Sequence, residues 1–97
     1  MIEFEWDPAK AEDNLRKHRV AFPEAATVFR DPLGITVHDP HHSDVEDRYL
    51  TVGATEDGRI LIIAHTEWRG RIRIISAREL NPKERREYEF EVRRRRR

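Results

Sequence analysis

Arginines and aromatic residues are interspersed among aliphatic residues in the second half of this 97-residue chain. Arg71 and Arg73 lie two residues apart in a β-like run, and Tyr49 and Trp68 lie in or beside the neighbouring β-like runs. Arginines bind phosphates and aromatic rings stack on unpaired bases, so this combination is typical of single-stranded RNA recognition. The alternative is that Arg71 and Arg73 form cross-strand ion pairs with carboxylates, each worth at most about 1 kcal/mol.

A second group of potential ligands is the segment 38–44, which reads His-Asp-Pro-His-His-Ser-Asp. Histidine and aspartate bind metal ions, but no helical or strand spacing orients these side chains and Pro40 interrupts them. We interpret the segment as a polar surface loop. The chain has no cysteine, which excludes disulfides, thiolate zinc sites and thiol nucleophiles. We expect no metal ion and no other cofactor.

Periodicity and turn residues predict the elements that carry these groups. Residues 1–6 alternate like a half-buried strand, and Asp7-Pro8 and Asn81-Pro82 are typical helix starts, the second with Glu84 completing a capping box. The remaining predicted elements are helices over 8–18, 23–30 and 82–92, a short strand over 35–37, a loop over 38–46, and strands over 49–55, 60–66 and 71–77.

This order predicts one α+β domain, with a three-stranded antiparallel meander, short N-terminal strands, two N-terminal helices packed on one face, and a C-terminal helix. The first helix is expected to bury Ala11, Leu15 and His18. The expected strand pairs are Thr66 with Arg73, Ala64 with Ile75, Val52 with Ile63, and Leu50 with His65. One face then collects Leu50, Val52, Ala54, Leu61, Ile63, Ile72 and Ile74, and the other collects Tyr49, Thr51, Thr66, Trp68, Arg71 and Arg73. A slip of one residue would exchange the faces.

The neutral net charge hides an asymmetry. The five arginines at 93–97 leave residues 1–92 with 14 Lys and Arg against 19 Asp and Glu, a net charge of −5. We expect residues 1–92 to form the domain and 93–97 to be a disordered basic tail, either a solvated terminus or an arm for phosphates or an acidic partner. With no signal peptide and no apolar run long enough to span a membrane, a cytoplasmic location is expected.

Several motifs resemble one protein family over about residues 2–90. The most specific is Arg73-Ile74-Ile75-Ser76-Ala77-Arg78, and the opening Phe4-Glu5-Trp6-Asp7-Pro8-x-Lys10 supports it. Further matches are Asn14, Lys17-His18, Phe22-x-x-Ala25, Phe29-x-Asp31-Pro32, Asp47-Arg48, Gly53 and Glu84-Arg85-x-x-Tyr88. In these motifs the chain resembles BrnT-type toxins of bacterial type II toxin–antitoxin systems. It departs from them at Glu79-Leu80-Asn81, at Arg19 where glycine is common, and in the arginine terminus.

The resemblance implies a RelE-like fold, metal-independent RNA cleavage that inhibits translation and growth, and neutralisation by a ribbon-helix-helix antitoxin (BrnA-like) in a 2:2 heterotetramer. Such cleavage uses the neighbouring 2′-hydroxyl as nucleophile and requires cations at the phosphate and groups that transfer protons. A non-enzymatic module that binds RNA or protein through the same surface is the alternative.

The residues expected to act are arginines first, because RelE-type ribonucleases depend on electrostatic stabilisation more than on a standard acid–base pair. Arg73, Arg78 and Arg48 are candidate phosphate clamps. The candidates for proton transfer are His18, Glu46, His65, Glu67 and Tyr88, and those for RNA binding are Lys17, Tyr49, Trp68, Arg71 and Ser76. Four of them have a structural alternative, in which Arg78 pairs with Glu84 or Glu87, Ser76 bonds the backbone, and His65 and Tyr88 only pack.

Overall fold

The computed structural model describes residues 1–42 and 44–96, and its centre is a five-stranded sheet in the order β1-β5-β4-β3-β2. The strands are β1 (Phe4–Glu5), β2 (Ile35–Asp39), β3 (Arg48–Ala54), β4 (Ile60–Trp68) and β5 (Arg71–Glu79). The helices are α1 (Pro8–His18), α2 (Phe22–Ala26), α3 (Pro82–Arg95) and the 3₁₀ turns η1 (Thr27–Arg30) and η2 (Pro40–His42). The predicted α+β class and the β3-β4-β5 meander are confirmed.

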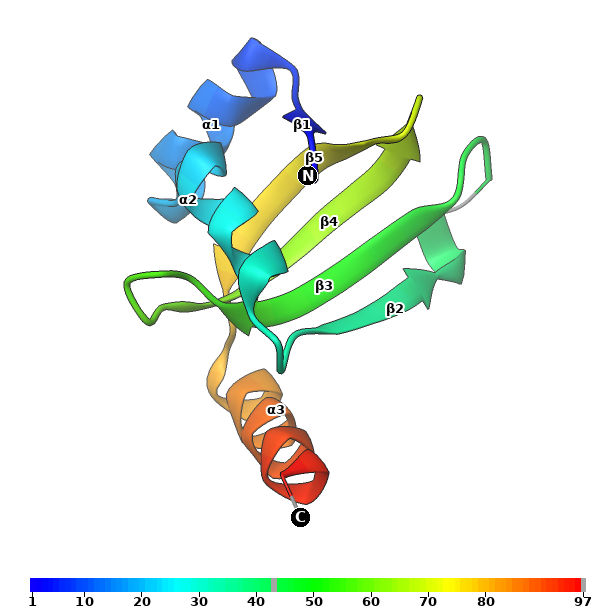
Figure 1. Cartoon of the computed structure of the whole chain (residues 1–97). Coiled ribbons are helices and arrows are strands. Elements are labelled where there is room, and N and C mark those ends of the chain that lie inside the picture. Colours follow the sequence, from blue (N-terminus) through cyan, green and yellow to red (C-terminus); the bar gives the residue numbers. More distant parts are fainter. Residues whose placement is uncertain (43, 97) are drawn as a thin grey trace.

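The sheet is mixed, not antiparallel as predicted. Strand β1 pairs in parallel with β5, bringing Phe4 opposite Ile72 and Glu5 opposite Arg73. A parallel pair needs a long crossover, and here the chain between the two strands forms α1, α2 and the strands β2 to β4. Figure 1 shows α1 and α2 lying against the sheet and α3 extending beyond the end of β5. No helix within residues 1–42 and 44–96 is long and apolar enough to cross a membrane.

The register of the first hairpin differs from the prediction by one residue. Val52 pairs with Ile62 and Leu50 with Ala64, because the connection is a tight loop in which Thr55 N–H donates to the Arg59 carbonyl at 2.8 Å. Leu50 and Val52 therefore lie on the face opposite Leu61 and Ile63, and Tyr49 and Thr51 lie on the face that the helices cover. The predicted single aliphatic patch is wrong, since its members are divided between the two faces.

The second hairpin keeps the predicted pair of Thr66 with Arg73 but changes register further along. Ala64 pairs with Ser76 instead of Ile75, because a β-bulge lies opposite Ala64 and His65. The two-residue connection of Arg69 (φ 52°) and Gly70 (φ 77°) has the left-handed backbone that tight hairpins require. A bulge changes which residues share a face, and this change determines the candidate site described below.

The core lies between the helices and one face of the sheet. Val20, Phe22, Ala25 and Val28 meet the sheet residues Leu61, Ile63, Ile74 and Ala77, and all eight are at most 1% exposed. At the edge of this core, Trp6 packs edge-on against Phe22 and Phe4 packs against Phe29. Burial of these side chains, each worth roughly 1.5–3 kcal/mol for the larger aliphatic and aromatic ones, attaches the N-terminal segment to the meander.

Helix α1 presents a different face from the one predicted. Leu15 is 49% exposed and His18 is exposed, whereas Asn14 is 5% exposed. The Asn14 amide donates to the carbonyls of Val20 and Ala77 at 3.0 and 2.9 Å, and its oxygen accepts from Ala77 N–H at 3.0 Å. This buried and fully hydrogen-bonded amide attaches α1 to β5. The hydrogen bonds of Asn14, and not the spacing of the apolar residues, therefore determine which side of α1 is buried.

Several element boundaries also differ from the prediction. The predicted helix over 23–30 divides into α2 and η1, and the short strand extends from residue 37 to Asp39, so that His38 and Asp39 belong to β2 and not to a loop. Helix α3 begins at Asn81-Pro82 with the predicted capping box and continues through Arg95 instead of ending near Val92. Arg93 to Arg95 are therefore helical, not disordered, and Arg96 is the helix cap; Ser43 and Arg97 lie outside the described residues. The domain boundary at residue 92 stays a prediction.

Candidate functional site

The face of the sheet opposite α1 and α2 carries a pocket of about 320 Å³, which we call the open-face pocket. Its polar lining comes from the end of β2, η2, β3 and β5, and its floor is aliphatic. The lining residues are Asp39, His42, Arg48, Leu50, Ile62, Ala64, Ile75, Ser76 and Arg78. Three of the residues singled out from the sequence, Arg48, Ser76 and Arg78, are therefore brought together.

The bulge in β5 is the reason that Ser76 and Arg78 reach this pocket. Strict alternation from Arg73 would put Ser76 and Arg78 on the helix-covered face with Ile74. The extra residue at the bulge reverses the alternation, so Ser76 faces the pocket beside Ala64 and Arg78 beside Ile62, while Ala77 enters the core. A local backbone irregularity thus aims two polar side chains at one place.

Arg78 is held by a two-pronged ion pair. Its Nη1 and Nη2 donate to Oε1 and Oε2 of Glu84 at 2.8 and 2.9 Å, and Nη1 also donates to the Glu79 carbonyl at 3.2 Å. The bond to Glu84 raises the pKa of Arg78. The bond from Arg78, followed by that from the Asn81 backbone N–H, lowers the pKa of Glu84 to about 2. The predicted pairing of Arg78 with Glu84 is therefore present, and it fixes the plane of the guanidinium.

This pair leaves one side of Arg78 available to a ligand. The guanidinium has five N–H donors, and the three hydrogen bonds to Glu84 and Glu79 occupy its Nη1 and half of its Nη2. The Nε hydrogen and the second Nη2 hydrogen have no partner among the described residues. These two donors form a parallel fork of the kind that binds two oxygens of one phosphate.

Arg73 and Arg71 are paired with the N-terminal strand. Arg73 Nη1 donates to Glu5 Oε2 at 3.1 Å, and Arg71 Nε donates to Glu3 Oε2 at 3.1 Å. The predicted alternative of cross-strand ion pairs therefore describes both. Arg73 still shares a row of the sheet with Thr66 and Arg48, two strands away or about 10 Å across the open face.

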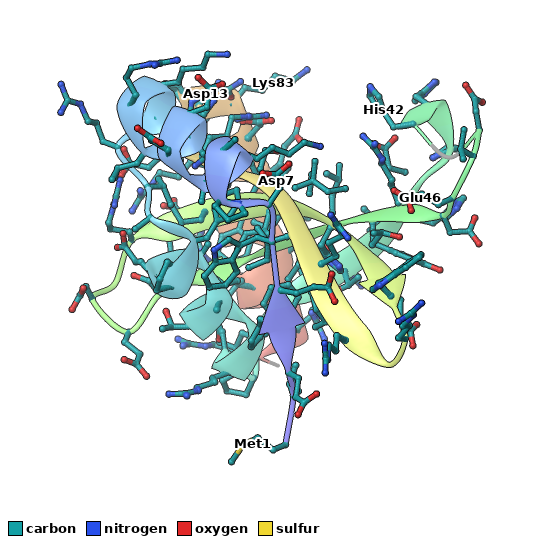
Figure 2. All side chains as sticks on the ribbon, turned by 90° about the horizontal axis from the view of Figure 1, so that it is seen from above. Met1, Asp7, Asp13, His42, Glu46 and Lys83 are labelled. Atoms are coloured by element: carbon teal, nitrogen blue, oxygen red, sulfur yellow. The ribbon has the colours of Figure 1, made fainter. Side chains whose placement is uncertain are left out.

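A histidine–aspartate pair stands at the rim of the open-face pocket. His42 Nδ1 lies 2.8 Å from Asp39 Oδ2, and the histidine side chain is 67% exposed whereas the aspartate is 14% exposed. The hydrogen bond from His42 lowers the pKa of Asp39. When Nδ1 donates to the carboxylate, the opposite ring nitrogen, Nε2, is left to accept or release a proton. Figure 2 shows His42 and Glu46 on the same segment between β2 and β3.

Sequence reasoning missed this pair. Asp39 and His42 were assigned to a polar loop, and only a metal site was considered for them. The available signal was the Asp-Pro-x-His spacing, because a single 3₁₀ turn brings residues i and i+3 to the same side. No group of three or more His, Asp or Glu side chains in the described part of the chain is placed to hold a metal ion.

Several predicted site residues do not reach the pocket. Lys17 pairs with Asp13 at 3.1 Å and His18 is exposed, both on α1, which packs against β5 from the other face. Glu46 and Glu67 are exposed and are not among the described residues that line the pocket. Trp68 is 43% exposed at the hairpin tip, with the Arg69 guanidinium 5.3 Å from its ring.

Three aromatic groups from the prediction, His65, Tyr49 and Tyr88, lie outside the lining of the open-face pocket and pack against other side chains. His65 is 7% exposed, hydrogen-bonds Thr51 through Nε2 at 2.7 Å, and contacts the rings of Phe29 and Tyr49. Burial lowers the pKa of His65 to about 4, so the ring is neutral in the core. Tyr88 donates to Asp31 Oδ2 at 3.4 Å, and burial followed by the charge of Asp31 raises its pKa.

Comparisons with known proteins agree with this architecture. A family model described as "Ribonuclease toxin, BrnT, of type II toxin-antitoxin system" matches residues 6–84. The crystal structure of the Brucella abortus ribonuclease toxin BrnT is similar, with a TM-score of 0.62 and 18% sequence identity, over 84% of this chain and 99% of that chain. No match was found among curated proteins.

Proposed function

Because the chain belongs to the BrnT family of ribonuclease toxins of type II toxin–antitoxin systems, we propose that it cleaves RNA at the open-face pocket without a metal ion. The observation that carries the proposal is the convergence of Arg48, Ser76, Arg78 and the Asp39–His42 pair on one pocket. The proposal places the chain among RelE-like ribonucleases, with electrostatic stabilisation as the main source of catalysis.

The nucleophile is supplied by the substrate. The 2′-hydroxyl of one nucleotide attacks the adjacent phosphorus, the bond to the 5′-oxygen breaks, and the products carry a 2′,3′-cyclic phosphate and a 5′-hydroxyl. Negative charge grows on the phosphate oxygens during this step, so fixed donors accelerate it. The open fork of Arg78, oriented by Glu84, is the principal donor in the proposal, and Arg48 and Ser76 add further contacts.

Protons must leave the 2′-hydroxyl and reach the 5′-oxygen. His42 is the proposed group for this transfer, because Asp39 fixes its tautomer and its ring stands at the pocket rim. Arg73 and Arg71, together with the exposed Trp68, extend the same face and are proposed to hold the flanking RNA. His18, Glu46 and Tyr88 have weaker support, because none of them lines the open-face pocket.

The test is cleavage of a single-stranded RNA by the purified protein in excess EDTA. We expect cyclic phosphate products, and a loss of kcat of roughly 100-fold or more for His42→Ala and Arg78→Ala. His41→Ala is the matched control, because this neighbouring histidine is exposed and is not among the described pocket residues. An equal loss in the His41 variant would refute the role of His42, and loss of cleavage in EDTA would refute metal independence.

RNA binding without cleavage by the wild-type protein would favour the alternative, a non-enzymatic binding module. Expression in bacteria that lack the antitoxin gene should arrest growth when the protein is wild type and should not when it carries Arg78→Ala. A type II system implies an antitoxin. We propose a ribbon-helix-helix partner in a 2:2 complex, which the mass of the co-purified complex would test.

A further inference from the structure

The surface of α3 that faces away from the sheet has an unusual composition. Glu84, Tyr88, Glu91 and Val92 are the half-buried residues of this helix, and none of its residues is fully buried. On the outward side Lys83, Arg86, Phe90 and Arg93 follow one another at intervals of three, four and three residues. This spacing places them in one row along the helix, which we call the α3 basic stripe. Phe90, in the middle of this stripe, is 66% exposed.

The charges of this stripe are less neutralised than those of the three β5 arginines. Arg71, Arg73 and Arg78 each have a carboxylate oxygen within 3.1 Å. In contrast, Arg86 and Arg93 form no ion pair with any described residue, and the ammonium of Lys83 stands 4.0 Å from the nearest Glu87 oxygen.

The positive charge continues beyond the stripe into the last turn of α3. Arg94 pairs with Glu91, whereas Arg95 and Arg96 form no ion pair within residues 1–42 and 44–96. Residues 1–81, which precede this helix, carry 11 Lys and Arg against 15 Asp and Glu, a net charge of −4, so the cations of α3 are set against an acidic body. The field at this end of the molecule therefore attracts a polyanion.

We propose that the α3 basic stripe binds single-stranded RNA outside the cleavage pocket, with arginines on the phosphates and Phe90 stacked on a base. This inference rests on the proposed function, which makes RNA the substrate. Helix α3 begins four residues after the pocket residue Arg78, contacts it through Glu84, and extends about 20 Å from there. A strand seated in the pocket can continue onto the helix.

An acidic protein partner fits the stripe less well. Protein interfaces have an apolar centre and a polar rim. Phe90, by contrast, has the charged residues Arg86, Glu87, Arg93 and Arg94 at the adjoining helix positions, so no apolar centre exists around it. An exposed ring beside several arginines is a combination that proteins use to hold single-stranded nucleic acid.

The experiment measures binding of a fluorescent RNA of about 20 nucleotides at several salt concentrations. Its riboses carry 2′-O-methyl groups, so that it cannot be cleaved by 2′-hydroxyl attack. The double variant Arg86→Ala with Arg93→Ala should weaken binding and reduce the salt slope by about 1.4, since each phosphate contact with a single strand contributes about 0.7. Phe90→Ala should weaken binding roughly fivefold or more with little change in slope.

The matched control is the double variant Arg16→Ala with Arg30→Ala. It removes the same charge from two exposed arginines outside α3, which pair with Asp13 and Glu56. Circular dichroism verifies that α3 remains helical. If the stripe variants bind RNA like this control, the inference is wrong. The inference is also wrong if the stripe variants bind RNA like the wild type and lose only the ability to bind the antitoxin.

The inference and the proposed function can fail separately. Cleavage of a dinucleotide, which is too short to reach α3, depends on the open-face pocket alone. Wild-type protein that cleaves no RNA but shows the stripe-dependent salt slope would overturn the proposed catalysis and support the inference. Suppose instead that the protein cleaves the dinucleotide, and that the stripe variants cleave a long RNA as well as the wild type does. The proposed function would then be supported and the inference overturned.

Discussion

Lowering the pH from about 7 to about 5 should destabilise this protein through one buried histidine. His65 is 7% exposed, and its pKa falls from 6.5 to about 4 on folding because burial disfavours the charged ring. Protonation therefore favours the unfolded chain, in which the ring is hydrated. The stabilisation by neutral His65 is complete above pH 6.5 and is lost progressively as the pH falls towards 4.

The size of the effect follows from the shift. A difference of about 2.5 pKa units corresponds to about 3 kcal/mol when the full range is crossed. Between pH 7 and pH 5 the linkage relation gives a loss of about 2 kcal/mol, a large part of the 5–15 kcal/mol typical of a small domain. Most carboxylates titrate below pH 5, so this interval isolates the histidines.

Urea unfolding at the two pH values measures the loss, with His65→Gln as the control. Glutamine does not titrate, and its amide can still hydrogen-bond the Thr51 hydroxyl, which lies 2.7 Å from His65 Nε2 and 2.7 Å from Thr36 Oγ1. The other four histidines are present in both proteins, so their contribution cancels in the comparison. If wild type and variant lose the same free energy of unfolding between pH 7 and pH 5, the reasoning is refuted.

Two further predictions concern α1. Asn14→Ala removes three buried hydrogen bonds to Val20 and Ala77 and should lower the free energy of unfolding by about 3 kcal/mol or more in urea, whereas the exposed Glu12→Ala should change it by less than about 0.5 kcal/mol. A loss below about 1 kcal/mol would contradict the role assigned to the amide. Arg19→Gly should raise the melting temperature, gaining about 0.5–1 kcal/mol, because Arg19 has a φ of 58°, which glycine adopts without strain. The hydrogen bonds from the Arg19 N–H to the Leu15 carbonyl and from Arg59 to the Arg19 carbonyl use backbone groups that glycine keeps. Arg19→Ala, which retains the Cβ, should give no such gain, and an equal gain would mean that backbone conformation is not the cause.

The features that the sequence predicted well depend on residues close together in the chain. The start of α3 requires only Asn81, Pro82 and Glu84, and the capping box forms as expected. The second hairpin depends on the connection of Arg69 and Gly70, where two adjacent residues with positive φ set the turn. The family motifs were equally visible, because residue types and spacing belong to the sequence itself.

The candidate site was predicted in part. Arg48, Ser76 and Arg78 were selected for their chemistry, and the pocket gathers them. Their common face was not predictable, since the bulge in β5 and the register of β3 depend on partner strands distant in sequence. Asp39 and His42 were overlooked because their segment has no regular periodicity, and the turn that joins them follows the end of β2.

The sequence by itself therefore determined the composition of the site, the local helix and hairpin signals, and the family to which the chain belongs. Only the tertiary structure decided which side chains meet. It paired β1 with β5, so that Glu5 meets Arg73, and it buried Asn14 in place of Leu15. Above all, it inserted the bulge that turns Arg78 from the core towards the open face. The reason is physical: side-chain direction in a strand alternates with a period of two, so one unpaired residue, fixed by contacts distant in sequence, reverses every direction after it.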